Sequence, residues 1–407
     1  MKILLVTPMP PQPQGSGAIP VVLHALLTGL THRHQVTLVT VVGPEPAEQE
    51  AIERLQVAGH EIFGVRLMKS TAYRRWQRRL RLIGAWLRGR YPWRTIWFSE
   101  PEIQRILDRL LVERRFDLVV VEDNAMGIYH YRTETPTIFT EHEVRRARPV
   151  NWHVGPPEDW LRWAFAEADW QRWQKYQPPI WRRFDCVQVF STRDAAAIGA
   201  LAPDVGARVR VNPFGINLPA VADSNREEEG TILFVGNFAH PPNVDAALWL
   251  GHEIMPRLRT RWPGVRLTIV GPFSPKAVKA LACADIYVAG LVPEIAPYLE
   301  RAAVVLAPVR IGGGMRMKVL QAMASSRAVV TTPRGADGLA MNGQQPPLII
   351  AENAERIADA VVALLADESA RRELGKRARA FVAEHFSPSA YVRRLEAIYE
   401  EMGNGKK

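Results

Sequence analysis

The chain of 407 residues is longer than one ordinary domain core, and its hydrophobic content of 47% and charged content of 23% are typical of a soluble globular protein with two domains. Two cysteines, Cys186 and Cys283, exclude a disulfide framework and a cysteine metal cluster, and no stretch has the roughly 20 apolar residues of a membrane-spanning helix. The formal net charge of +10 suits an anionic partner: nucleic acid, an anionic membrane surface or a phosphorylated substrate.

The first half of the chain alternates short apolar runs with an amphipathic helix and longer polar segments. The runs predict strands at residues 2–7, 35–42, 116–121, 137–140, 185–190 and 209–211. The opening MKILLVTP predicts a buried strand and no secretory signal, because proline stops the apolar run early. Strands that alternate with helices are typical of a parallel, doubly wound sheet. Residues 1–222 are therefore predicted to form a Rossmann-like first domain of a cytoplasmic protein.

A proline-rich loop follows the first predicted strand, and Gly15 and Gly17 stand where it enters the helix predicted at about residues 19–30. A dinucleotide-binding fingerprint needs a third glycine at a set distance, and none follows here. A Rossmann dehydrogenase is therefore poorly supported.

Two insertions interrupt the first domain, at residues 70–100 and 151–183. Within the first, Tyr73–Phe98 is rich in arginine and tryptophan and has no acidic residue. A helix reaching about Arg88 has an apolar row on one face, formed by Trp76, Leu80, Ile83 and Leu87. Such a segment predicts an interfacial helix on an anionic membrane surface, with packing on its own domain and nucleic-acid binding as the alternatives. The second insertion holds six tryptophans and predicts a helix whose aromatic face covers the domain.

A polar, non-periodic stretch indicates a linker at residues 223–230, and a new strand begins at once at residues 231–235. Further strands are predicted at residues 266–270, 286–288, 304–307, 328–331 and 348–350. Helices alternate with them, so residues 231–386 are predicted to form a second Rossmann-like domain. The last helix, within residues 387–407, is expected to pack back on the first domain.

The most informative stretch is 303–340, which reads as strand, glycine loop, helix and strand. A glycine loop that opens a helix lets backbone N–H groups approach a phosphate, at the sheet edge where such folds bind ligands. Three cations lie close to this loop, namely Arg310, Arg316 and Lys318. The alternative is an ordinary tight connection flanked by solvated basic residues.

Five motifs occur in a fixed order along the chain. They are PQPQGSGAIPVVLHALLTGLTHRHQVTLVT after the first strand, EHEVRR, STRDAAAI before RVNPFGIN, FVGNFAHPPNVDAALWL and RIGGGMRMKVLQAMASSRAVVTTPRGADGL. In this order and spacing the chain resembles the GT-B glycosyltransferases, specifically the large retaining family that uses nucleotide-sugar donors. The resemblance implies two tandem Rossmann-like doubly wound domains, an acceptor-side first domain and a donor-binding second domain, with the active site in the cleft between them.

The resemblance also implies roles for particular residues. The donor diphosphate is expected near Gly313, Gly314, Met315 and Arg316, with Lys318 as its charge partner, and Gly236 and Asn237 are expected to line the same pocket. Gly15 and Gly17 would close over the diphosphate or sugar from the first domain. His142 stands where many relatives place a functional histidine that faces the sugar; the alternative is a structural histidine at a strand end.

Retaining transfer of this type implies front-face attack, in which the departing diphosphate accepts the acceptor's proton. The enzyme then positions the reactants and stabilises the leaving charge, which Arg316 and Lys318 can do. The sequence has no Asp-x-Asp motif, so no metal and no other cofactor are expected.

Three positions depart from the family pattern. Relatives commonly carry two glutamates eight positions apart, and this chain has Gly313 and Gln321 there. The turn that usually ends in aspartate ends here in Asn217. An amide offers one acceptor and one donor where a carboxylate accepts two ribose hydroxyls, so donor affinity is expected to fall by about 1–2 kcal/mol.

The resulting prediction is a retaining transferase that moves a sugar from a nucleotide-sugar donor to a glycan or lipid-linked acceptor, in cell-surface polysaccharide or glycolipid synthesis. It would be cytoplasmic, peripheral on the inner face of the cell membrane, with no nucleic-acid partner. The alternative is a catalytically weakened GT-B protein that binds a nucleotide sugar or glycan as a regulator. A sugar-nucleotide epimerase of the same architecture would need an acid–base set, which Glu141, His142 and Glu143 meet weakly.

Overall fold

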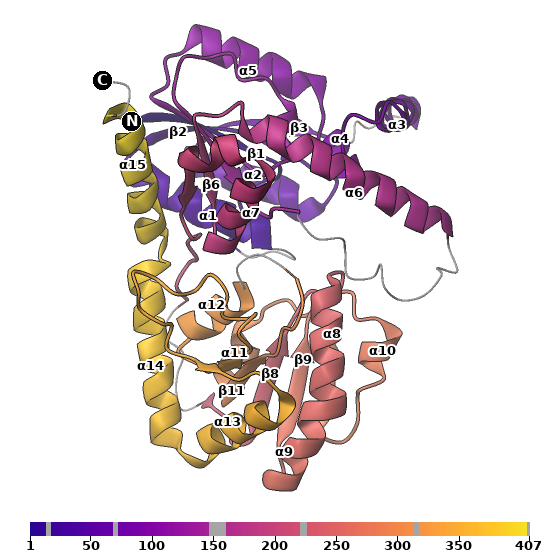
Figure 1. Cartoon of the computed structure of the whole chain (residues 1–407), viewed down its shortest axis with the longest axis vertical. Helices are drawn as coiled ribbons and strands as arrows, with labels where there is room; N and C mark the ends of the chain where they lie inside the picture. Colours follow the sequence, from indigo (N-terminus) through magenta and orange to yellow (C-terminus); the bar gives the residue numbers. More distant parts are fainter. Residues whose placement is uncertain (14–17, 68–71, 146–159, 220–225, 313–316, 405–407) are drawn as a thin grey trace. The chain divides into compact units, whose positions relative to one another are not determined.

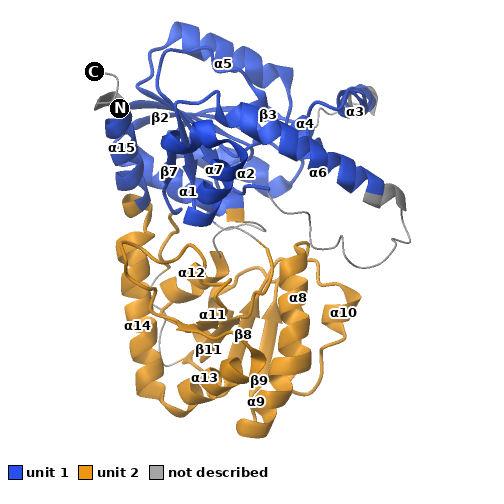
Figure 2. Cartoon of the chain, viewed as in Figure 1, with its two compact units in different colours: residues 1–15, 19–214, 391–407 blue, residues 16–18, 215–390 orange. Residues whose placement is uncertain are grey.

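The computed structural model describes residues 1–13, 18–67, 72–145, 160–219, 226–312 and 317–404. They form two compact α/β units, each built on one parallel sheet (Figures 1 and 2). Unit 1 comprises residues 1–15, 19–214 and 391–407, and unit 2 comprises residues 16–18 and 215–390. The predicted fold class, two tandem Rossmann-like domains, is confirmed. The predicted linker at residues 223–230 lies partly outside the described residues.

Unit 1 contains a seven-stranded sheet in the order β3-β2-β1-β4-β5-β6-β7. Its strands are β1 (Lys2–Thr7), β2 (Gln35–Val42), β3 (Glu61–Arg66), β4 (Leu118–Glu122), β5 (Thr137–Glu141), β6 (Cys186–Val189) and β7 (Val209–Val211). Its helices are α1 (Ala18–Thr31), α2 (Pro46–Val57), α3 (Ala72–Leu87), α4 (Trp93–Trp97), α5 (Pro101–Glu113), α6 (Trp160–Trp181) and α7 (Thr192–Leu201), with single 3₁₀ turns η1 (Met126–Ile128) and η3 (Pro203–Arg208).

The central strands of unit 1 are buried on both faces. Strand β1 pairs in parallel with β2 and β4, and Ile3, Leu4, Leu5 and Val6 have no exposed surface. A strand covered on both faces needs a continuous apolar run, which explains why β1 was predictable from its sequence. Edge strand β3 was not predicted, because it is only partly buried and contains Gly64 within a mixed polar segment. A glycine in a strand weakens the hydrophobic pattern on which the prediction rests.

Unit 2 contains a six-stranded sheet in the order β10-β9-β8-β11-β12-β13. Its strands are β8 (Thr231–Val235), β9 (Arg266–Val270), β10 (Ile286–Gly290), β11 (Val304–Ala307), β12 (Ala328–Thr331) and β13 (Ile349–Ile350). Its helical segments are α8 (Pro241–Trp249), η5 (Leu250–Ile254, one π turn), α9 (Met255–Arg261), α10 (Lys276–Lys279), α11 (Ala296–Arg301), α12 (Met317–Ala324), α13 (Ala354–Ala366) and α14 (Glu368–His385). The predicted strand–helix–strand order of 303–340 corresponds to β11, α12 and β12.

The last helix, α15 (Pro388–Asn404), belongs to unit 1 from Tyr391 onward. The Tyr391 hydroxyl accepts a hydrogen bond from Gln188 Nε2 at 3.0 Å, and Arg394 Nε donates to Asn212 Oδ1 at 2.8 Å. Further along the helix, Glu396 pairs with His34 at 2.6 Å. These contacts join α15 to the residue before β2, to β6 and to the residue after β7.

Helix α6 packs its aromatic residues into the core of unit 1. Trp173, Tyr176 and Trp181 are at most 4% exposed. Residues 151–159 of the predicted second insertion lie outside the described residues. Within the described part of the chain, no helix is both long enough and apolar enough to cross a membrane.

Candidate functional site

Each sheet has one place where its strand order reverses. In unit 1 the reversal lies between β1 and β4, and in unit 2 it lies between β8 and β11. Helices that follow the two strands at such a point lie on opposite faces of the sheet, which leaves a crevice at the carboxyl ends of the strands. These two edges are therefore the first places to look for a site.

In unit 2, strand β8 is followed by Gly236, where the backbone is closely approached by its neighbours. A Cβ atom on Gly236 would lie 3.0 Å from the Cβ atom of Asn243. On the neighbouring connection Gly271 has φ of 148°, and a Cβ atom there would come within 1.8 Å of the Gly236 carbonyl oxygen. The Gly236 N–H donates to the Val270 carbonyl at 2.9 Å. The backbones after β8 and β9 are thus packed directly together, with no side chain between them.

Asn237 holds the next part of this turn. Its Oδ1 accepts a hydrogen bond from the Ala239 N–H at 3.0 Å, and its carbonyl accepts one from Asn243 Nδ2 at 2.6 Å. The chain can then enter α8 at Pro241. Asn237 therefore shapes the loop through its side chain as well as its backbone.

Lys318 lies in the first turn of α12, directly beyond the glycine loop. Its Nζ donates to Asn243 Oδ1 at 2.5 Å and lies 4.7 Å from the centre of the Phe234 ring. The amide oxygen accepts a hydrogen bond from the ammonium group, and the face of the ring attracts its positive charge. A positive charge is thus held at the reversal point of the unit 2 sheet, between the starts of α8 and α12.

In the sequence Arg310 belongs to a cluster of three cations near the glycine loop, but in the structure it is paired with a carboxylate. Its guanidinium makes two hydrogen bonds to Asp245, at 2.7 and 3.1 Å, and lies 4.7 Å from the centre of the Trp249 ring. A bidentate carboxylate neutralises the charge and fixes the side chain on α8. Arg310 is therefore a structural residue between the loop and α8.

Gln321 lies one turn after Lys318 on α12, and both side chains are half-buried. Residues three apart share one side of a helix, so the two are neighbours on the less buried side of α12. The other predicted donor residues, Gly15, Gly17, Gly313, Gly314, Met315 and Arg316, lie outside the described residues.

In unit 1, the carboxyl ends of β4 and β5 bring a buried polar cluster together. His142 follows β5, and its Nε2 lies 2.7 Å from Oε2 of Glu122, the last residue of β4. The second oxygen of Glu122 accepts a hydrogen bond from Thr140 Oγ1 at 2.8 Å. Glu122 has no exposed surface, and the His142 side chain is 9% exposed. The histidine is thus oriented by a carboxylate that is itself fixed.

The charge of His142 depends on this partner. Burial lowers the pKa of His142, but the hydrogen bond and charge of Glu122 and the charge of Asp123 outweigh it, so the pKa of His142 is raised above 6.5. Arg94 opposes the rise by its positive charge. The raised pKa means that the imidazole keeps its proton to a higher pH than a free histidine.

Asp123 is strained and charged. Its φ of 75° is unusual for a residue with a side chain, and such strain is found at functional sites. Arg94 Nη2 donates to Asp123 Oδ2 at 2.9 Å, and the Ala125 N–H donates to Oδ1 at 2.9 Å. Burial alone would raise the pKa of Asp123, but the charges of Arg94 and His142 lower it below its ordinary value. The carboxylate therefore stays ionised.

Glu141 is the third acid of the cluster. Its two oxygens accept hydrogen bonds from Asn124 Nδ2 at 2.9 Å and from Trp181 Nε1 at 3.0 Å. Burial raises the pKa of Glu141 to about 7, with a further rise from the charge of Asp123. Glu143, by contrast, is exposed. The three residues of the Glu-His-Glu run therefore lie in three different environments.

Sequence reasoning missed Glu122, Asp123 and Arg94. The first two end the apolar strand β4, and acids that stop a buried strand are a signal that points to the carboxyl edge of a sheet. Arg94 comes from α4, within the first predicted insertion, and no local pattern marks it. Among the described residues, no group of three or more His, Cys, Asp or Glu side chains is arranged to hold a metal ion.

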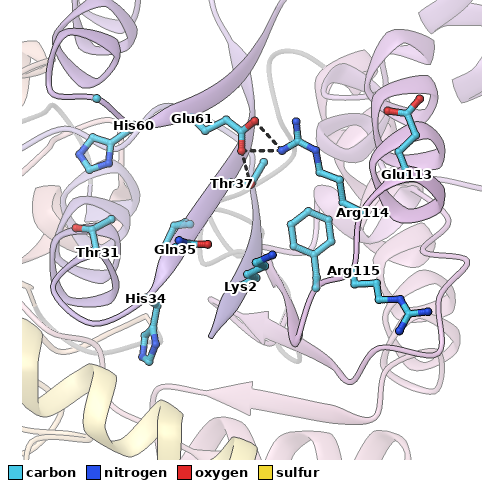
Figure 3. Close-up of a pocket in the computed structure, with 13 residues that line it drawn as sticks. Lys2, Thr31, His34, Gln35, Thr37, His60, Glu61, Glu113, Arg114 and Arg115 are labelled. Atoms are coloured by element: carbon cyan, nitrogen blue, oxygen red, sulfur yellow. Dashed lines mark hydrogen bonds and ion pairs between the residues drawn. The ribbon is translucent and has the colours of Figure 1, made fainter.

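A hollow of about 680 Å³ lies at the opposite, amino-terminal edge of the unit 1 sheet (Figure 3). Its polar side chains pair with one another: Arg114 Nη1 contacts both oxygens of Glu61, at 2.6 and 2.8 Å, and Thr37 Oγ1 donates to the same carboxylate at 2.7 Å. The crevice that a strand-order reversal creates lies at the carboxyl ends of the strands, which is the other edge of this sheet. The size of the hollow therefore does not make it the better candidate.

The fold is that of the GT-B glycosyltransferases. A solved structure titled as Anabaena Alr3699/HepE in complex with UDP superposes with a TM-score of 0.63 over 98% of this chain and 100% of that one, at 12% identity. A likeness at this level of identity concerns the fold alone.

Residues 229–367 match the family model described as Glycosyl transferases group 1. The matched segment coincides with most of unit 2.

Two curated proteins are similar over part of their length. An uncharacterized 44.6 kDa protein in the cps region of Klebsiella pneumoniae is 27% identical over 165 residues, which are 38% of this chain and 42% of that protein. The uncharacterized glycosyltransferase MJ1069 of Methanocaldococcus jannaschii is 30% identical over 94 residues, 23% of this chain and 24% of that protein. Each match therefore spans less than half of the relative.

Proposed function

We propose that the chain is a retaining glycosyltransferase that moves a sugar from a nucleotide-sugar donor to a glycan or lipid-linked acceptor. The observation that carries the proposal is the position of Lys318. Its ammonium group lies 2.5 Å from Asn243 Oδ1 and 4.7 Å from the centre of the Phe234 ring, at the reversal point of the sheet in the unit whose residues 229–367 match the glycosyl transferases group 1 model. A diphosphate leaving group needs such a fixed cation, since negative charge grows on it during transfer.

The class of donor and the biological setting rest on relatives. The fold neighbour in Anabaena was solved with UDP, and the Klebsiella relative is encoded in a cps region. These support a nucleotide-sugar donor and a role in cell-surface polysaccharide or glycolipid synthesis. We also propose a cytoplasmic location, peripheral on the inner face of the cell membrane, where a lipid-linked acceptor would be available.

In the proposed reaction, Lys318 and Arg316 stabilise the departing diphosphate without a metal ion. The side-chain-free backbone at Gly236 admits the donor close to the end of β8, and Gln321 bonds the ribose. The departing diphosphate takes the proton of the acceptor hydroxyl as the new glycosidic bond forms on the same face of the sugar. Protein side chains then need only to position and to stabilise charge.

His142 is proposed to donate a hydrogen bond to the reacting groups. Glu122 occupies Nε2 at 2.7 Å, which leaves Nδ1 as the ring nitrogen for a ligand. The raised pKa of His142 favours the form in which Nδ1 carries a proton. Glu122 is then a positioning residue. The epimerase alternative is less favoured, because Glu141 has no exposed surface and both its oxygens accept hydrogen bonds from within the protein, from Asn124 and Trp181.

The decisive experiment is a thermal-shift and hydrolysis screen of the purified protein with UDP-, GDP-, ADP- and dTDP-sugars, with and without EDTA. Binding raises the melting temperature by mass action. We expect one nucleotide to stabilise the protein strongly and to be released slowly as the free diphosphate, equally well with EDTA. NMR of the product anomer then tests retention. Loss of release in EDTA would contradict metal-independent transfer.

A second candidate is supported by the neutral side chains at Gln321 and Asn217, where a carboxylate would bind donor hydroxyls more strongly. It is a GT-B protein that binds a nucleotide sugar or glycan and no longer transfers it. Stabilisation by one nucleotide sugar without any release, even with membrane extract as a source of acceptor, would favour it. No stabilisation by any of the four donors would contradict both candidates.

A further inference from the structure

Helix α3 exposes its apolar side to solvent. Four large side chains, spaced four, three and four residues apart, form one row along it, which we call the apolar row: Trp76, Leu80, Ile83 and Leu87. They are 58%, 49%, 49% and 70% exposed. Figure 1 shows α3 at the periphery of unit 1, with its axis nearly along the line of view. An amphipathic helix normally turns such a row toward the core, so this orientation needs an explanation.

The opposite side of α3 holds the helix in this orientation. Leu82 is 2% exposed, so it is the buried anchor of the helix. Arg78 Nε donates to Glu100 Oε1 at 2.7 Å, and its guanidinium lies 4.6 Å from the centre of the Trp97 ring. Arg81 donates to the same carboxylate oxygen at 3.0 Å. Arg78 and Arg81 thus face the protein, while the apolar row faces outward.

A neighbouring helix adds a further restraint. The Trp86 ring stacks on Phe165 of α6 with ring centres 4.7 Å apart, and the Arg172 guanidinium lies 4.0 Å from the centre of the same ring. Rotation of α3 to bury the apolar row would break these contacts and the pairs with Glu100. The exposed row is therefore a stable feature of the fold.

The row is also unusual in its density. Other large apolar side chains with comparable exposure among the described residues are spread over several helices and loops, for example Val57, Val112, Tyr287 and Leu291. Single exposed apolar residues are ordinary on protein surfaces, but a contiguous set marks an interaction surface.

The charges around the row indicate its partner. No aspartate or glutamate occurs between Leu67 and Ser99. Exposed arginines flank the row or follow it, namely Arg79, Arg88 and Arg90. Apolar side chains that insert among acyl chains, with cations at the level of the phosphates, match an anionic bilayer. Trp76, whose ring is amphipathic, suits the boundary between headgroups and acyl chains.

We propose that α3 is an interfacial helix that docks unit 1 on an anionic lipid bilayer through the apolar row. The row inserts below the headgroups, and the flanking arginines bind lipid phosphates. The inference does not depend on the proposed transferase activity, because every contact that carries it lies on α3, α4, α6 or Glu100, the residue before α5. It narrows the predicted segment Tyr73–Phe98 to one face of one helix.

The test is sedimentation of the full chain with phosphatidylcholine vesicles, with or without phosphatidylglycerol. We expect binding only to the anionic vesicles, weakened by salt as for any surface charge effect. The double variant Leu80→Glu/Ile83→Glu should lower partitioning by about tenfold or more, since two inserting side chains are lost. The matched control is Val57→Glu/Val112→Glu, which adds the same charge at exposed apolar positions on α2 and α5 of the same unit and should change partitioning by about twofold at most.

Three outcomes would overturn the proposal. The first is no binding of the wild-type chain to anionic vesicles. The second is an equal loss of binding in the two double variants, which would show that the effect comes from the change in net charge and not from the apolar row. The third is a wild-type dimer in solution that Leu80→Glu/Ile83→Glu converts to a monomer, which would assign the row to a second copy of this chain. Thermal unfolding of both variants checks that each is folded, and the donor-induced thermal shift separates this result from the proposed function.

Discussion

The carboxyl edges of the two sheets have the same topology and opposite chemistry. Both lie where the strand order reverses, after β1 and β4 in unit 1 and after β8 and β11 in unit 2. The edge in unit 2 is made of close-packed backbone and one lysine whose partners are an amide and a ring. The edge in unit 1 is made of buried carboxylates that hold a histidine and an arginine.

The difference shows how one fold supports two tasks. A fixed cation at a sheet edge attracts an anion, which is what the proposed donor site requires. At the edge in unit 1 the charges are already paired, so this edge does not bind a free ion strongly. Its carboxylates instead fix the orientation of the His142 ring and raise its pKa. The variants below test this division, in order of decreasing effect.

Lys318→Ala should have the largest effect. Removing one fixed donor to a developing charge typically costs roughly 10²–10³-fold in kcat, and the same loss is expected here in steady-state transfer or donor hydrolysis. Lys279→Ala, at an exposed position on α10, is the control and should leave kcat unchanged. Equal kcat in Lys318→Ala and wild type would end the assignment of Lys318 to the leaving group.

Gly271→Ala should destabilise unit 2. The residue has φ of 148°, and a Cβ atom would meet the Gly236 carbonyl oxygen at 1.8 Å, so the free energy of unfolding should fall by roughly 2–4 kcal/mol. The matched control is Gly199→Ala on α7, where a Cβ atom meets nothing within 4 Å. It should raise stability by about 0.5–1 kcal/mol, as alanine does in a helix interior. Urea unfolding of both variants measures the contrast.

Glu122→Gln should change the pH dependence more than the maximal rate. It replaces a charge-assisted hydrogen bond by a neutral one, for which we expect about a tenfold loss in kcat. Because Glu122 raises the pKa of His142, the variant should lose activity at a lower pH as pH rises. The control is Glu143→Gln, because Glu143 is an acid close to His142 in the chain but exposed to solvent. An unshifted pH profile in Glu122→Gln would show that His142 does not titrate in the reaction.

The protonation of His142 also makes the stability of the fold depend on pH. The pKa of His142 is raised on folding, so its contribution is fully present below the ordinary value of 6.5 and is lost as pH rises through the folded value. Glu122→Gln should therefore reduce the loss of stability that occurs as pH rises through the folded pKa of His142. NMR titration of the histidine resonances in both proteins measures the two pKa values directly.

Gln321→Glu should have the smallest effect, and in the opposite direction. A carboxylate at this position accepts two ribose hydroxyls, so donor affinity should rise about 5- to 30-fold, equivalent to about 1–2 kcal/mol. Calorimetry with the donor found in the screen measures it, with exposed Gln345→Glu as the control. Unchanged affinity would show that the ribose is bound elsewhere.

Much of the fold was determined by the sequence alone, because buried parallel strands are continuous apolar runs. Strands β1, β2, β8, β9, β11 and β12 were predicted at the residues where the structure has them. The edge strand β3 was missed. It pairs with the sheet on one side only and is partly buried, so its sequence lacks the continuous apolar run of the other strands. Local sequence also marked the glycine loop, Lys318 and His142, since a βα connection and a strand end are encoded by neighbouring residues.

Only the tertiary structure decided which of these residues act together. Arg310 and Lys318 look alike in the sequence, yet Asp245 neutralises the first, while Asn243 and the Phe234 ring surround the second. Glu122 and Arg94 reach His142 and Asp123 from separate elements, and no spacing in the chain predicts that. For α3 the helical period determined the apolar row, but whether it faced the core or the solvent depended on Glu100, Trp97 and Phe165. Charge and burial depend on neighbours in space, and the chain sets those neighbours only when it folds.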